Sequence, residues 1–323
     1  MTNSLFQRIE DAHRAIRPQV VVTPLAHSPM LSKLSGCEVY LKCEHLQHTG
    51  SFKFRGASNK IRLLDADARR RGVLAVSSGN HGQAMALAGK LAGVPVTVYA
   101  RSTASPVKLD AIRALGAELI TIDDTSLAVE LEAGRQAKLK GMCFVSPYND
   151  IDVIAGQGTI GIELHEQAQA AGIDLAAVFA SVGGGGLISG VGAAVRELLP
   201  QTDVVGCWPA HSTALYRSLE AGRIVDGEER DTISDGTAGG VEPDTITLGI
   251  GQQVISRTTL VTEEQIMAAM KLLARTERWM IEGSAGVALA SMLKLADPYQ
   301  GRAVAVVLSG RNIVLEKFIE AVK

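Results

Sequence analysis

The chain has 323 residues, 46 % of them hydrophobic, with 33 glycines, which is the profile of a globular α/β protein with one large domain or two smaller ones. The formal net charge of −2 lacks the basic excess that is typical of proteins binding nucleic acid or an anionic membrane surface. That charge gives no reason to expect a nucleic-acid partner. The longest apolar runs have the length of strands, so we expect no membrane span.

The N-terminal segment and the spacing of the cysteines indicate in which cellular compartment the protein is located. Residues 1–8 lack the apolar stretch of a signal peptide. The cysteines at positions 37, 43, 143 and 207 lie far apart and form no C-x-x-C motif, a pattern typical of reduced thiols. We therefore expect a cytoplasmic protein.

Strands and helices alternate in the first half of the chain. In chain order we expect a strand at Val73–Ser78, a helix at His81–Ala92, a strand at Val94–Ala100, a helix at Pro106–Leu115, a strand at Glu118–Ile122, a helix at Leu127–Lys140 and a strand at Met142–Val145. Such alternation is typical of a parallel sheet covered by helices. We expect residues 72–149 to form a small, substrate-side domain.

A second alternation follows at larger scale. We expect strands at Ala176–Val182, Val204–Trp208 and Ala303–Ser309, and helices at Leu187–Leu199, Glu263–Arg275 and Ala285–Leu295. The N-terminal segment has no core of its own, so residues 1–71 and 150–323 are expected to form one large, discontinuous domain. The prediction is a two-domain α/β fold with parallel-rich twisted sheets flanked by helices, and with a ligand-binding cleft between the domains.

A lysine and a distant glycine run suggest one binding site. Lys53 lies in residues 49–57, TGSFKFRGA, before a helix start rich in small residues, and partial burial would depress the pKa of its amine. Residues 181–187 read SVGGGGL, and an approaching phosphate explains four glycines better than a simple turn does. An amine and a phosphate cradle together fit a phosphorylated aldehyde such as pyridoxal phosphate (PLP). A solvated lysine and an ordinary turn are the alternatives.

Two further polar segments follow predicted strands. Residues 77–83, SSGNHGQ, open a helix whose N–H groups can face a substrate carboxylate, although a turn capped by Asn80 gives the same pattern. Ser309 ends the last strand, where its hydroxyl could meet a ring nitrogen or cap a helix. The histidines form no H-x-x-x-H pattern, so we predict no metal site.

Taken together, these segments resemble the fold-type II PLP enzymes, and within them the threonine/serine dehydratase and serine racemase group. The resemblance runs from Thr23 to Asn312 and also includes residues 155–159, AGQGT. It implies a fold similar to that of the tryptophan synthase β-subunit and PLP as the cofactor. It further implies a homodimer or homotetramer that takes an amino acid as its small-molecule substrate.

The resemblance also implies roles for matching positions. Lys53 would form the Schiff base with PLP and act as an acid/base, and Ser78 would be the acid/base on the opposite ring face in racemases. The cofactor would be held by Phe52 beside the ring, Asn80 at the 3′-oxygen, Gly183, Gly184, Gly185, Gly186 and Leu187 at the phosphate, and Ser309 at the pyridine nitrogen. The substrate would lie against Ser77, Ser78, Gly79 and His81.

The implied reaction is β-elimination from L-threonine or L-serine, giving a 2-oxo acid and ammonia. A neutral serine at the ring nitrogen suits elimination better than transamination. Three alternatives stay open: a racemase of the serine or aspartate type, a dehydratase for a substituted β-hydroxy amino acid such as 3-hydroxyaspartate or an intermediate of hydroxyectoine breakdown, and a ligand-binding protein that has lost catalysis. Lys53, Asn80 and the glycine loop argue against the last.

The chain departs from the family pattern at a cation site. Close relatives often carry an acid before a proline, and a second acid a little later, which together bind a divalent cation. Here Trp208 precedes the proline and Ala214 takes the later position, although Asp235 is nearby. These departures argue against a bound cation.

Two further departures leave the substrate open. Gly283 follows Glu282 where a proline is usual, and Arg311 replaces the second glycine of a Ser-Gly-Gly-Asn motif. Both variants resemble a subgroup named for hydroxyectoine utilisation. A dicarboxylate substrate would need a further cation in the pocket, for which Arg135 and Arg311 are candidates.

Overall fold

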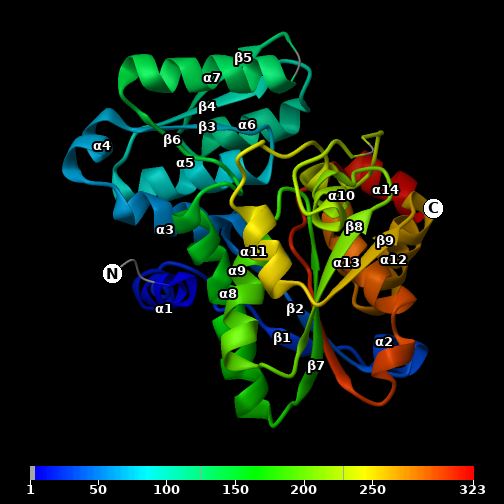
Figure 1. Cartoon of the computed structure of the whole chain (residues 1–323). Helices are drawn as coiled ribbons and strands as arrows, with labels where there is room; N and C mark the ends of the chain where they lie inside the picture. Colours follow the sequence, from blue (N-terminus) through cyan, green and yellow to red (C-terminus); the bar gives the residue numbers. More distant parts are fainter. Residues whose placement is uncertain (1–3, 125, 228) are drawn as a thin grey trace.

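The computed structural model describes residues 4–124, 126–227 and 229–323, and two sheets organise this part of the chain (Figure 1). The larger sheet has the strand order β1-β2-β10-β7-β8-β9. Its strands are β1 (Leu25–His27), β2 (Glu38–Lys42), β7 (Leu175–Ser181), β8 (Asp203–Pro209), β9 (Arg257–Val261) and β10 (Ala303–Val307). Only β1 runs antiparallel to its neighbour, and the other pairs are parallel.

The smaller sheet has four parallel strands in the order β5-β4-β3-β6. They are β3 (Val73–Val76), β4 (Val96–Arg101), β5 (Glu118–Ile122) and β6 (Cys143–Phe144). Helix α5 (Asn80–Ala92) packs on one face and α7 (Ser126–Lys140) on the other, while α6 (Pro106–Ala114) lies beside α5. Figure 1 shows this unit at the top, beside the larger sheet.

The predicted alternation of elements is confirmed in both halves of the chain. Each strand and helix expected between residues 73 and 145 is present, with ends that differ by a few residues. The N-terminal strands β1 and β2 join the larger sheet, as expected for a segment without its own core. The division into domains 1–71 with 150–323 and 72–149 stays a prediction.

The 21-residue helix α8 (Ile151–Ala171) is not indicated by the sequence pattern. It packs against α1 (Leu5–Ile16), α3 (Lys53–Leu63) and α9 (Gly186–Leu198), so its apolar residues face several directions and no single stripe forms. Glycines permit this crowding. A Cβ at Gly156 would lie 2.6 Å from the carbonyl oxygen of Arg55.

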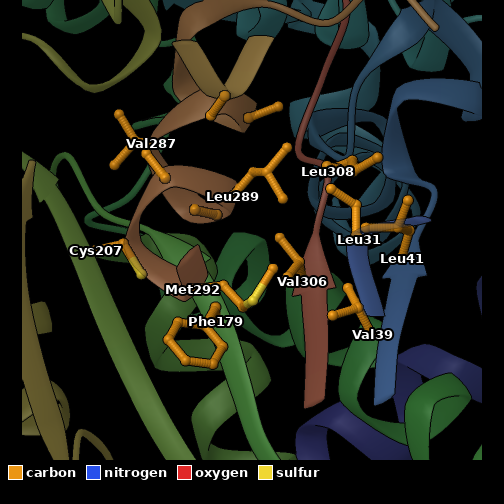
Figure 2. Close-up of a cluster of buried hydrophobic side chains, with 14 of the residues drawn as sticks. Leu31, Val39, Leu41, Phe179, Cys207, Val287, Leu289, Met292, Val306 and Leu308 are labelled. Carbon is orange, nitrogen blue, oxygen red and sulfur yellow. The ribbon is translucent and has the colours of Figure 1, made fainter. Parts of the chain in front are cut away.

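The main core lies between the larger sheet and helices α12 (Glu263–Thr276) and α13 (Gly283–Lys294) (Figure 2). The other face of this sheet packs on α8 and α9. Because both faces are covered, all seven residues of β7 are buried and no apolar/polar alternation appears. The remaining elements are α2 (Pro29–Ser35), α4 (Ala66–Arg71), α10 (Ala214–Ala221), α11 (Thr247–Val254), α14 (Leu315–Val322) and the 3-10 turns η1 (Glu44–Leu46), η2 (His48–Gly50), η3 (Asp235–Thr237) and η4 (Asp297–Tyr299).

No helix in the described ranges has both the length and the apolar character that crossing a bilayer requires.

Four buried charges join β2, η1, α3 and α8. Arg55 donates to both oxygens of Glu44, at 2.8 and 2.8 Å, and to both oxygens of Glu163, at 2.7 and 2.8 Å. Lys42 Nζ donates to Glu163 at 2.6 Å and to the carbonyl oxygen of Thr23 at 2.7 Å. Although burial opposes ionisation, Arg55 and Lys42 hold the pKa of Glu163 below its ordinary value. Burial lowers the pKa of Lys42, whereas the two carboxylates raise the pKa of Arg55 against the effect of burial, so Glu163 and Arg55 stay charged inside the protein.

Removing one charge from this network should destabilise the fold. We expect Glu163→Gln to lower the free energy of unfolding by about 3–5 kcal/mol, because Lys42 and Arg55 lose a buried anionic partner. Glu166→Gln, on the same helix, is the matched control. Glu166 pairs with Arg17 and His13 but its own side chain is 42 % exposed, so a loss below about 1 kcal/mol is expected. Urea unfolding of both variants measures the difference, and equal losses would contradict the prediction.

Candidate active site

One cavity of about 410 Å³ collects side chains from both sheets. It lies where β3, β7 and β10 end, the edge at which parallel sheets commonly bind ligands. All the site residues predicted from the sequence line it: Phe52, Lys53, Ser77, Ser78, Gly79, Asn80, His81, Gly183, Gly184, Gly185, Gly186, Leu187 and Ser309. The fold thus brings together segments that are far apart in the sequence.

Lys53 is the first residue of α3, so its amine enters the cavity from a helix N-terminus. Its Nζ donates to the carbonyl oxygen of Pro147 at 2.9 Å and lies 5.1 Å from the centre of the Phe52 ring. Burial lowers the pKa of Lys53 to about 8, although the nearby Glu282 carboxylate raises it. A substantial fraction of the amine is therefore neutral at mildly alkaline pH.

The glycine loop between β7 and α9 is packed against other parts of the chain. A Cβ at Gly183 would lie 2.8 Å from the Cα of Thr237, and one at Gly184 would overlap the ring of Tyr148. Gly185 has a φ of +91°, in the left-handed region that favours glycine. Packing alone therefore requires glycines here, which the sequence argument attributed to an approaching phosphate. The loop leads into α9, whose first N–H groups have no helical carbonyl as partner.

Glu282 is a central side chain of the cavity to which the sequence analysis assigned no role. Its carboxylate accepts two hydrogen bonds from Asn80 Nδ2, at 2.9 and 3.0 Å, and one from the backbone N–H of Asn312, at 3.0 Å. Asn312 Nδ2 in turn donates to Asn80 Oδ1 at 2.6 Å. Burial raises the pKa of Glu282 to about 7. Asn80 thus contacts this acid and Asn312 from within the cavity.

The segment after β3 offers mainly backbone groups and hydroxyls. A Cβ at Gly79 would meet nothing within 4 Å among the described residues, so a ligand can approach the backbone there. His81 Nε2 donates to the carbonyl oxygen of Val145 at 3.0 Å. Burial lowers the pKa of His81 to about 3, with a further contribution from Lys53. Its neutral ring leaves Nδ1 as an acceptor, so a carboxylate would be held by Ser78 and the N–H groups of α5.

The sequence analysis gave no substrate- or cofactor-binding role to several further polar side chains that line the cavity, among them Arg101, Lys108, Tyr148 and Asp235. Lys108 forms an ion pair with Asp235, which joins α6 to η3 across the cavity. Arg101 is the last residue of β4, and Ser309 likewise comes just after a strand, β10. The position of Arg101 at the end of an apolar strand was the signal in the sequence that could have marked it as a site residue.

The cations suggested for a dicarboxylate lie elsewhere. Arg135 pairs with Glu132 on α7, and Arg311 is exposed. The Trp208 indole is buried and packs edge-on against Tyr216, with ring centres 5.6 Å apart. Within the described ranges, no group of three or more histidine, cysteine or acidic residues could hold a metal ion.

Comparison with known proteins identifies the family. The family model described as "Pyridoxal-phosphate dependent enzyme" matches residues 16–310. The chain belongs to this family. This PLP-dependent enzyme is 39 % identical to an L-threonine ammonia-lyase of Thermotoga maritima, over 95 % of this chain and 75 % of that one. It is 37 % identical to a beta-hydroxyaspartate dehydratase of Paracoccus denitrificans, over 95 % of each chain.

A solved structure supports the same assignment. The PLP-dependent enzyme superposes on the serine racemase of Dictyostelium discoideum with a TM-score of 0.89 and 36 % identity, covering 98 % of this chain and 100 % of that one. These findings confirm the predicted fold-type II architecture and the predicted cofactor.

The cavity has groups that fit each polar end of PLP. The Ser309 hydroxyl is buried and has no hydrogen-bond partner among the described residues, which suits a neutral pyridine nitrogen. The N–H groups at the start of α9 suit a phosphate. The Lys53 amine suits the aldehyde, and the Phe52 side chain is available beside the ring.

A methyl group in the glycine loop should disturb the cavity. We expect Gly184→Ala to lower the free energy of unfolding by about 1–3 kcal/mol, because the new Cβ overlaps Tyr148. Gly249→Ala in α11 is the control, since a Cβ there meets nothing within 4 Å among the described residues. It should be neutral or stabilise by up to about 1 kcal/mol. Denaturant unfolding of the cofactor-free proteins tests this, and a Gly184→Ala variant as stable as the wild type would contradict it.

The raised pKa of Glu282 predicts a pH-dependent stability. Because the folded-state pKa is about 7 and the ordinary value is 4.5, the folded protein holds a proton that the unfolded chain releases. Glu282 therefore destabilises the fold fully above about pH 7, and this penalty disappears as the pH falls towards 4.5. As the pH rises through that window, the free energy of unfolding of Glu282→Gln should increase by roughly 3 kcal/mol relative to that of the wild type. A difference that does not change with pH in urea titrations would refute the assignment.

Proposed function

We propose that this PLP-dependent enzyme is an ammonia-lyase that converts a β-hydroxy amino acid, L-threonine or L-serine, to a 2-oxo acid and ammonia. The observation that carries the proposal is that the buried Lys53 amine shares one cavity with the Ser309 hydroxyl, which has no hydrogen-bond partner in the described part of the chain. A neutral group at the ring nitrogen favours reactions in which a leaving group carries electrons away. The similarity to the Thermotoga L-threonine ammonia-lyase and the Paracoccus beta-hydroxyaspartate dehydratase supports the same reaction class.

The residues around the cavity supply binding and proton transfer. When bound, PLP supplies an electron-accepting ring that stabilises negative charge at the substrate α-carbon. The Lys53 amine takes the α-proton, for which its lowered pKa keeps a neutral fraction available. It then returns a proton to the departing β-hydroxyl, which leaves as water. Hydrolysis of the resulting enamine gives the 2-oxo acid and ammonia.

The proposed binding roles follow the cavity lining. Ser77, Ser78, Gly79 and His81 surround the substrate carboxylate, with Ser78 and the α5 N–H groups as donors. The cofactor is held by Lys53, Phe52, Asn80, Ser309 and the loop Gly183, Gly184, Gly185, Gly186 and Leu187. The network of Asn80 with Glu282 supports this arrangement, because it fixes the amide beside the ring site.

Racemisation is a second candidate, favoured by one observation. The Ser78 hydroxyl lines the same cavity as Lys53 but comes from a different element, so two acid/base groups can face the α-carbon from two directions. Chiral analysis of L-serine after incubation separates the two activities.

We also infer a cytoplasmic homodimer or homotetramer. The four cysteines are free, which supports a reducing compartment. Met30 and Leu34 on α2 are exposed, which supports a surface that a second copy covers.

Loss of the amine tests the proposed function. We expect wild-type enzyme to release ammonia and a 2-oxo acid from L-threonine or L-serine, and Lys53→Ala to reduce that rate by about 10³-fold or more, because the proton acceptor is lost. The visible absorbance of the reconstituted protein should change in the same variant. Lys33→Ala, at an exposed position, is the control. No ammonia from either amino acid would reject the proposed substrates.

A further inference from the structure

Two cations in the cavity have no task in the dehydration of threonine or serine. Arg101 is the exposed last residue of β4, and Lys108 lies in the first turn of α6. Both line the same cavity as Lys53. A hydrogen or a methyl group on the substrate β-carbon would gain nothing from positive charge. The substrates that would use these side chains therefore carry an anion at that carbon.

Strand pairing places Arg101 beside the expected carboxylate site, and Lys108 reaches the same cavity from α6. β3 and β4 are parallel neighbours, and the N–H of Ser77 donates to the carbonyl oxygen of Tyr99 at 3.0 Å. Two residues further along the two segments lie Gly79 and Arg101. Neighbouring strands are about 4.8 Å apart, a spacing comparable with that between the two carboxylates of a four-carbon amino acid. One carboxylate can therefore lie against α5 while the other reaches the end of β4.

Arg101 has donors left for such a ligand. Its Nε donates to the carbonyl oxygen of Asp124 at 3.0 Å, which uses one of the five N–H donors of the guanidinium and anchors the group. A planar guanidinium binds a carboxylate through two parallel hydrogen bonds.

Lys108 can exchange its present partner for a ligand. Its ammonium pairs with Asp235, whose side chain is 51 % exposed while that of Lys108 is 18 % exposed. Ion pairs that remain in contact with water contribute little stability, so an incoming carboxylate can replace Asp235 at small cost. The negative charge of Asp235 also opposes a second anion in the subsite, which makes it a competitor.

We propose that Arg101 and Lys108 form a second anion subsite that binds a carboxylate on the substrate β-carbon, so that the enzyme dehydrates 3-hydroxyaspartate. This inference rests on the proposed function and uses the same steps. The α-proton and the β-hydroxyl leave as water, and hydrolysis of the enamine gives a 2-oxo dicarboxylic acid and ammonia. No oxidant or further reactant is needed.

The decisive experiment compares two substrates across matched variants. Lys108→Met and Arg101→Gln should each lower kcat/KM for 3-hydroxyaspartate about tenfold or more relative to kcat/KM for L-threonine. Asp235→Asn should change the same ratio in the opposite direction, because a competing carboxylate is removed. Arg135→Gln, which removes a cation outside the cavity, should leave both values unchanged. A ratio that stays constant in all three cavity variants would overturn the subsite.

A competition assay uses only the wild-type enzyme, so its outcome does not depend on the folding of any variant. L-aspartate has no β-hydroxyl to eliminate, and L-asparagine is its neutral isostere. L-aspartate should inhibit L-threonine turnover with an inhibition constant about tenfold lower than that of L-asparagine, and added salt should reduce the difference. Equal inhibition by the two amino acids would overturn the subsite.

The same pair separates this inference from the proposed function. If the wild type releases no ammonia from any amino acid, the proposed function fails. Calorimetric titration of the PLP-loaded protein with L-aspartate and L-asparagine then decides the subsite alone. Preferential binding of L-aspartate that is lost in Lys108→Met supports it, and equal binding rejects it.

Discussion

The position of the Lys53 amine depends on a salt-bridge network that water does not reach. Arg55 lies two residues after Lys53 on α3, and its guanidinium is held by carboxylates from η1 and α8. Two positive and two negative side chains balance each other there, so the desolvation of each charge is offset by close, well-aligned partners. Helix α3 cannot rotate or slide without breaking several of these bonds. These bonds therefore set how far the Lys53 side chain projects into the cavity, although Lys53 itself makes few contacts.

Electrostatics inside the cavity follow from the same burial. The pKa of Lys53 falls to about 8 and that of Glu282 rises to about 7, so both groups can be neutral near physiological pH. Because the two pKa values converge towards neutral pH, either group can exchange a proton with a substrate at low cost in free energy. His81 is also neutral. In the proposed binding mode, a phosphate and an α-carboxylate meet helix N-termini, α9 and α5, rather than formal cations. This leaves Arg101 and Lys108 as the full positive charges facing any further anion.

Much of this site could be predicted from the sequence because its motifs sit where strands end. Lys53, the glycine loop, residues 77–81 and Ser309 each lie at the end of an apolar strand or at the start of a helix, and parallel strands bring such ends together. The helix from 151 to 171 could not be predicted, since helices surround it and its apolar residues form no stripe. Arg101 and Lys108 were missed, although Arg101 follows an apolar strand. The sequence does not show that β4 and α6 bring these two side chains to one cavity, and the cations nominated from sequence, Arg135 and Arg311, lie outside the cavity lining.

The unusual glycine after Glu282 gains a physical reason that links it to the substrate. A Cβ at Gly283 would overlap the carbonyl oxygen of Ile233, so a side chain there would push the segment before η3 away from α13. The Ser234 hydroxyl donates to the Ser284 hydroxyl at 3.3 Å, which holds the two segments together. Asp235 follows directly and reaches Lys108 from this anchored position. A proline at position 283 would displace that carboxylate. The departure from the family motif therefore acts on the charge balance of the second anion subsite, and through it on which β-substituent the cavity admits.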